Sequence, residues 1–180
     1  MNTNSESNGE WEVAVSSGQP LEIERKFLVD APPESDKVVS RTDVVQGYLA
    51  VAEDGAEVRL RRKGNRYFQT VKGSGDLVRV ESEIEMTPEQ FRELWPATEG
   101  RRVEKTRYEM PYDGLTIELD VYHGRLEGLY TAEVEFVSLS ESEAFVTPSW
   151  FGSEVTHDNR YKNKFLALNG IPDAPRSTCV

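Results

Sequence analysis

Apolar and polar residues alternate with a period of two along most of the chain between residues 21 and 138. This period places successive side chains on opposite faces of an extended backbone, so it predicts β-strands. About eight strands are predicted, at 21–29, 44–51, 56–62, 66–73, 77–86, 101–112, 115–122 and 130–138. Turn signals such as Gly64-Asn65 and Asp113-Gly114 link several of them and predict hairpins between antiparallel neighbours.

Three segments with helical character interrupt this pattern, at 88–95, 140–146 and 159–169. Thr87, which is followed by a proline, is typical of a helix start. Ser140, with a glutamate three residues later, resembles a capping box. Asp158 is expected to cap the last helix, and Gly170 is expected to end it. The predicted fold class is therefore α+β, mainly β.

The polar faces of the predicted strands carry full charges rather than a mixture of polar side chains. Glu22, Glu24 and Lys26 share a face of the first strand, and Arg59 and Arg61 share a face of the third. Like charges on one face repel each other unless something neutralises them. A metal cation beside the carboxylates and a polyanion beside the basic groups would do so. The alternative is that these faces are the solvated side of an antiparallel sheet, which is the common arrangement.

Eight antiparallel strands can close into a barrel, which removes exposed sheet edges and leaves room for one small ligand. If the charged faces point inward, the apolar faces point outward and give the helices a surface to pack on. The pattern thus predicts an eight-stranded antiparallel closed β-barrel, a tunnel, with helices packed outside.

Length and composition limit the classes of protein to which this chain can belong. The chain has 180 residues, which suits one domain, here expected over 21–170 between a disordered N-terminal tail at 1–20 and a C-terminal tail at 171–180. Its net charge of −11 argues against a nucleic-acid partner and against docking on anionic lipid. No apolar run is long enough for a membrane span. A single cysteine excludes an internal disulfide and suits a cytoplasmic location.

The segment 22–26, Glu-Ile-Glu-Arg-Lys, matches the ExExK pattern of the CYTH superfamily, also called triphosphate tunnel metalloenzymes. Further motifs follow in the same order: Gln46-Gly47-Tyr48-Leu49, Val58-Arg59-Leu60-Arg61, Thr70-Val71-Lys72, Arg79 with Glu81 and Glu83, Lys105-Thr106-Arg107-Tyr108, Ile117-Glu118-Leu119-Asp120, Ala132-Glu133-Val134-Glu135-Phe136, Trp150-Phe151-Gly152, Val155-Thr156 and Tyr161-Lys162-Asn163. Throughout 21–170 the chain is similar to the compact bacterial members. The resemblance implies an eight-stranded tunnel that holds a triphosphate with divalent metal ions, usually Mg²⁺ or Mn²⁺.

The resemblance also implies roles for the charged faces. The implied metal ligands are Glu22, Glu24, Glu118, Asp120, Glu133 and Glu135. The implied phosphate-binding residues are Lys26, Arg59, Arg61, Lys72, Arg79, Lys105 and Arg107. The residues expected to act in catalysis are Glu22, Glu24, Lys26, Glu133 and Glu135. The pattern does not decide which of Glu81, Glu83 and Glu85 reach the centre, or whether Lys162 contacts phosphate or solvent.

These residue types suit phosphoryl transfer, in which positioning and charge stabilisation dominate. Arginine binds phosphate oxygens in a fork, and Mg²⁺ prefers carboxylate, water and phosphate oxygens. The first hypothesis is an inorganic triphosphatase in which metal-activated water attacks a terminal phosphate and a carboxylate accepts the proton. The alternatives are a class IV adenylate cyclase or a thiamine triphosphatase, which act on organic triphosphates, and a non-catalytic polyphosphate- or nucleotide-binding module. The expected assembly is a monomer or a homodimer.

Overall fold

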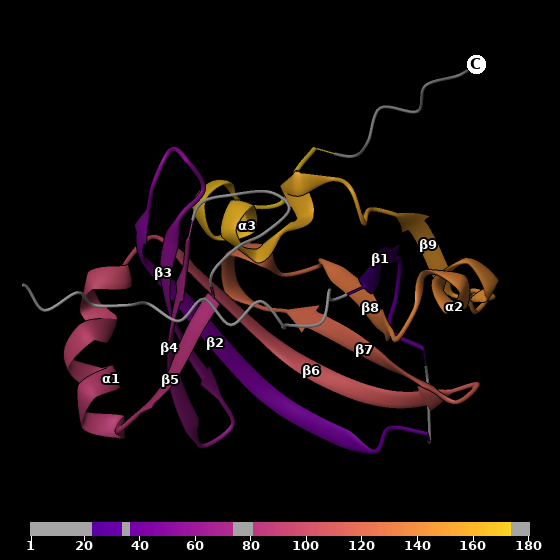
Figure 1. Ribbon diagram of the computed structural model, residues 1–180, viewed down its shortest axis with the longest axis horizontal. Coiled ribbons are helices and arrows are strands. Elements are labelled where there is room, and N and C mark those ends of the chain that lie inside the picture. The colour runs from indigo at the N-terminus through magenta and orange to yellow at the C-terminus, as the bar shows by residue number, and fades with distance from the viewer. Residues whose placement is uncertain (1–22, 34–36, 74–80, 174–180) are drawn as a thin grey trace, which may run out of the picture.

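The computed structural model describes residues 23–33, 37–73 and 81–173 of the chain (Figure 1). The predictions for Glu22, Arg79 and most of the two tails lie outside these residues. Nine antiparallel strands form one curved sheet in the order β5-β4-β3-β2-β6-β7-β8-β1-β9. The strands are β1 (Ile23–Val29), β2 (Ser40–Val51), β3 (Glu57–Lys63), β4 (Arg66–Lys72), β5 (Glu81–Met86), β6 (Arg102–Tyr112), β7 (Leu115–Tyr122), β8 (Tyr130–Phe136) and β9 (Phe151–Glu154).

The predicted α+β, mainly β architecture is confirmed, but a closed barrel is not. Among the described residues β5 and β9 are the two edges of the sheet, and no hydrogen-bonded ladder joins them. The sequence pattern also missed β9, which pairs with β1 through Phe27↔Glu154 and Val29↔Phe151. Four residues that include a glycine are too short a run to show a period of two.

Two helices lie on the outer face of the sheet (Figure 1), and each packs on an apolar cluster. Helix α1 (Pro88–Leu94) brings Phe91 against Leu60 and Met86. Its predicted start is confirmed, because Thr87 and Gln90 form a reciprocal capping box. Helix α2 (Leu139–Ala144) lies beside β1 and β8, where Phe145 packs on the apolar cluster that contains Ile117 and Val134. Its cap is Ser138 rather than the predicted Ser140, because the Ser138 side chain accepts a hydrogen bond from the Glu141 amide.

The last helical segment lies elsewhere than expected. The predicted single helix is divided into the 3-10 turn η3 (Asn159–Tyr161) and helix α3 (Asn163–Asn169), because Lys162 between them is extended. Leu166 and Tyr161 pack with Tyr48 and Tyr122 in a buried cluster on the side of the sheet that carries the charges. Helix α3 therefore closes one end of the concave face instead of covering the exterior.

Two further 3-10 turns, η1 (Trp95–Thr98) and η2 (Gly124–Leu126), connect α1 to β6 and β7 to β8. No helix among the described residues has the length and hydrophobicity needed to cross a bilayer.

Candidate functional site

The concave face of the sheet encloses a cavity of about 1170 Å³ whose walls come from strands β1 to β8 and whose end comes from η3 and α3. Because side chains two apart on a strand point the same way, most residues of the charged alternating faces line this cavity. Of the described residues singled out in the sequence, those that line it are Glu24, Lys26, Arg59, Arg61, Lys72, Glu81, Glu83, Lys105, Arg107, Glu118, Glu133, Glu135 and Lys162. The described exceptions are Asp120 and Glu85.

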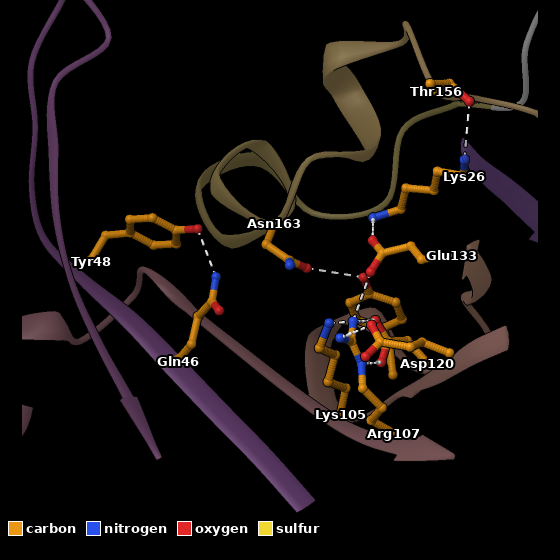
Figure 2. A network of polar contacts seen from close by, with 11 residues as sticks. Lys26, Gln46, Tyr48, Lys105, Arg107, Asp120, Glu133, Thr156 and Asn163 are labelled. Carbon is orange, nitrogen blue, oxygen red and sulfur yellow. Dashed lines mark hydrogen bonds and ion pairs between the residues drawn. The ribbon is translucent and has the colours of Figure 1, made fainter. Parts of the chain in front are cut away.

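Arg107 is the centre of one charge cluster (Figure 2). Its guanidinium donates to both oxygens of Asp120, at 2.7 and 2.6 Å, to Glu133 at 2.7 Å and to Glu118. Burial alone would lower the pKa of Arg107, but the hydrogen bond and the charge of Asp120, with the charges of Glu133 and Glu118, raise it well above its usual value. Arg107 is therefore a permanent cation that ties strands β6, β7 and β8 together.

Asp120 lies behind this cluster rather than on the cavity wall. Its side chain is 0% exposed and contacts both Lys105 and Arg107. The implied role of Asp120 as a metal ligand stays a prediction, and its observed contacts are those of a residue that fixes two cations.

Lys26 and Glu133 join the first strand to the eighth (Figure 2). Their Nζ and Oε1 atoms lie 2.8 Å apart, and Lys26 is almost fully buried. Burial by itself would lower the pKa of Lys26, but its interactions with Tyr122 and with the Glu133 carboxylate raise it. Burial by itself would raise the pKa of Glu133, yet Lys26, Lys105 and Arg107 hold it well below its ordinary value. Both groups are therefore charged at neutral pH.

A second cluster lines the wall made by β3, β4 and β5. Arg61 lies 2.8 Å from Glu83 and Lys72 lies 2.8 Å from Glu81, whereas Arg59 is 4.0 Å from both carboxylates. Burial, together with the positive charge of nearby Arg59, lowers the pKa of Arg61.

Two buried donors in this second cluster have no hydrogen-bond partner within the described chain, Nε of Arg59 and Nε of Arg61. Unsatisfied buried donors are costly, so this wall suits an anion with several oxygens.

The structure separates the three glutamates of β5 that the sequence left open. Glu81 and Glu83 line the cavity. Glu85 instead pairs with exposed Arg66 at 3.0 Å, away from the cavity. Lys162 does reach the cavity from the junction of η3 and α3, and its ammonium group has no ion-pair partner among the described residues.

Four of the six carboxylates that the sequence set apart for a metal form two facing pairs. Glu24 is the Cα partner of Glu135, and Glu118 is the Cα partner of Glu133. Like charges directly opposite each other are destabilising. Burial raises the pKa of Glu118, and the charge of Glu133 adds to this rise against the opposing effect of Arg107.

The donor chemistry of these four carboxylates fits a hard divalent cation, which prefers oxygen ligands. Within the described ranges, no three His, Cys, Asp or Glu side chains are already arranged to hold a metal ion. In the structure the guanidinium of Arg107 contacts Glu118 and Glu133 and is the cation that balances this pair.

Several uncharged contacts at the site were not assigned roles from the sequence. The Gln46 amide donates to the Tyr48 hydroxyl at 2.7 Å, and the Tyr122 hydroxyl donates to the Asn163 side-chain oxygen at 3.0 Å (Figure 2). Asn163 belongs to the Tyr-Lys-Asn motif and holds α3 at the cavity end. The motif was the available signal, but the contact of Asn163 with Tyr122 depends on how α3 packs against the sheet, where it lies on β2 and β6.

Comparison with known proteins gives a consistent picture. The family model described as the CYTH domain matches residues 20–161. A protein of Nitrosomonas europaea named inorganic triphosphatase is 53% identical over 82% of this chain and 97% of its own length. One of Acetivibrio thermocellus with the same name is 36% identical over 82% of this chain and 94% of its own length. A crystal structure of an inorganic triphosphatase, 50% identical, covers 85% of this chain and 97% of its own with a TM-score of 0.70.

Proposed function

This chain belongs to the CYTH domain family, and we propose that it hydrolyses inorganic triphosphate to pyrophosphate and phosphate with a divalent metal ion. The observation that carries the proposal is the cavity, where basic and acidic side chains from seven of the strands line one space. The names of the two relatives, each of which is aligned over nearly its whole length, point to the same activity.

The basic residues supply what a triphosphate needs. Arg59 and Arg61 lie on one wall, and Lys26 and Arg107 lie on strands β1 and β6. Forked guanidinium groups bind two phosphate oxygens at once, and ammonium groups act as compact charges. In the proposed reaction these groups fix the chain of phosphates and stabilise the negative charge that moves to the leaving pyrophosphate.

The acidic residues supply a place for Mg²⁺ or Mn²⁺. Glu24, Glu118, Glu133 and Glu135 would hold the ion, with Glu22 as a further candidate outside the described residues. When bound, the ion would neutralise phosphate charge and orient the attacking water. A carboxylate of the cavity would accept the proton that this water releases.

Product analysis tests the proposed substrate. The full-length protein is incubated with Mg²⁺ or Mn²⁺ and, separately, with tripolyphosphate, ATP and thiamine triphosphate. Fast phosphate release from tripolyphosphate, well above that from the two organic triphosphates, is expected. Cyclic AMP with pyrophosphate would instead identify a cyclase, and preferred turnover of thiamine triphosphate would identify a thiamine triphosphatase. Tight binding of tripolyphosphate without any turnover would identify a binding module.

Removal of the metal tests the second part of the proposal. EDTA is expected to abolish phosphate release, and excess Mg²⁺ is expected to restore it. Glu24→Gln, which removes a proposed ligand from an exposed position of β1, should lose turnover without losing its fold as seen by circular dichroism. Full activity in EDTA would contradict the role of the metal.

A further inference from the structure

The carboxylate of Glu133 forms ion pairs with two of the basic side chains that we propose bind triphosphate. Its Oε1 lies 2.8 Å from Nζ of Lys26, and its Oε2 lies 2.7 Å from Nη2 of Arg107. The two cations come from strands on opposite sides of β8 and its partner β7, so Glu133 bridges them across the cavity floor. Its side chain is 13% exposed, which makes these contacts poorly screened by solvent.

We infer that Glu133 is a clamp that competes with triphosphate for Lys26 and Arg107, so that tight binding of triphosphate requires a cation to take over the Glu133 carboxylate. This inference rests on the proposed function and assigns a mode of regulation to the same site. A buried ion pair that loses one partner leaves a charge without compensation, which is strongly unfavourable. Triphosphate that binds without a metal must therefore break the clamp and leave Glu133 unpaired beside new negative charge.

A divalent cation removes this cost because it neutralises the carboxylate that the two basic groups leave. Metal and triphosphate then strengthen each other's binding by the same factor, as linkage requires. The clamp would keep metal-free triphosphate out of the cavity. Under the proposed function the protein hydrolyses triphosphate only when a metal ion is bound.

Glu135 provides a matched comparison for Glu133. It lies two residues further along β8, on the same face, and lines the same cavity. In the described part of the chain it forms no ion pair with Lys26, Arg107 or any other basic residue, and it is exposed. Glu133→Gln and Glu135→Gln remove the same charge from the same cavity, but only the first variant opens the clamp.

The test is binding of tripolyphosphate to the full-length protein in EDTA, measured by isothermal titration calorimetry at fixed ionic strength. Glu133→Gln is expected to bind tripolyphosphate about tenfold more tightly than the wild type, a typical coupling between two sites. Glu135→Gln is expected to change affinity by at most about threefold, as for one screened charge. Equal tightening by both variants, or none by Glu133→Gln, would overturn the clamp.

Two further measurements keep the test decisive. If Glu133→Gln does not fold, Glu133→Asp replaces it, because the shorter side chain keeps the charge but cannot reach Lys26 and Arg107 together, and it should tighten metal-free binding more than Glu135→Asp does. Equal affinities of these two aspartate variants would then overturn the clamp. Titration of the wild type with tripolyphosphate in the presence of Mg²⁺ separates the two proposals. Absence of binding in this titration would refute the proposed function itself. Normal binding there, together with the same affinity of Glu133→Gln and wild type in EDTA, would refute only the clamp.

Discussion

Arg107 and Asp120 face each other as Cα partners across β6 and β7, and two guanidinium nitrogens of Arg107 reach the two carboxylate oxygens at 2.7 and 2.6 Å. Asp120 is 0% exposed, whereas Arg107 lines the cavity. The buried Asp120 carboxylate therefore orients the guanidinium of Arg107, which lines the cavity. It also contacts Lys105, so one buried anion orients two basic groups.

Asp120→Asn should destabilise the protein strongly. The change leaves Lys105 and Arg107 without their buried counter-charge, and breaking a buried ion pair costs about 3–5 kcal/mol. The free energy of unfolding, measured by urea denaturation in EDTA, should fall by this amount. The exposed control Glu127→Gln should change it by less than about 0.5 kcal/mol. A loss for Asp120→Asn as small as that of the control would contradict the role of Asp120 as an anchor.

Arg59→Ala should lower the turnover of tripolyphosphate by at least about 100-fold, as for the loss of one positioned donor to developing charge. Arg59 lines the cavity and has a buried Nε without a partner in the described chain. Arg66→Ala is the control, because Arg66 comes from the neighbouring strand but pairs with Glu85 outside the cavity. Steady-state phosphate release with Mg²⁺ measures both variants. Equal rates for the two would show that Arg59 does not contact the substrate.

Gly47→Ala should destabilise the fold through a steric clash. A Cβ atom on Gly47 would lie 2.5 Å from Oγ1 and 2.6 Å from Cβ of Thr98, which is fully buried in η1. Overpacking of this kind costs about 1–3 kcal/mol. Thermal denaturation of both single variants and of Gly47→Ala/Thr98→Gly gives a double-mutant cycle. The double variant should lose less stability than the sum of the single changes, and simple additivity would speak against the contact.

Glu154→Gln should lower the melting temperature of the protein at neutral pH but not at low pH. The Arg25 guanidinium, which donates to both Glu154 oxygens at 2.9 and 2.7 Å, lowers the pKa of Glu154. Because the pKa of Glu154 is lower in the folded protein than in the unfolded chain, where it is 4.5, the ionised carboxylate stabilises the fold at pH values above 4.5. This stabilisation is lost as the pH falls through the pKa of Glu154 in the folded protein. Because Glu154 is 39% exposed, the effect should stay below about 1 kcal/mol. Melting temperatures of wild type and variant should converge between neutral and acid pH, and curves that stay parallel would exclude this contribution.

The sequence predicted the strands and the direction of their charges well, because both depend on local geometry. The pleat of a strand sends alternate residues to opposite faces, so Arg59 and Arg61 reach one side whatever the rest of the chain does. The start of α1 was equally predictable, because the capping box of Thr87 and Gln90 spans only four residues. Strand β9 and the position of α3 were not predictable, because pairing with a distant strand and packing on a distant face leave no local period.

The sequence by itself determined that acidic and basic faces alternate along one set of strands, and this pattern led to the family. Only the tertiary structure decided which charges meet. It brought Glu133 between Lys26 and Arg107, and it placed Asp120 behind the cavity wall. These pairings depend on the register of strands that are far apart in the chain, and a shift of one residue would turn every side chain to the other face. The physical reason is that the local backbone conformation decides which face of the strand a side chain points to. The residues that this side chain contacts are decided by how the strands pair in the folded sheet.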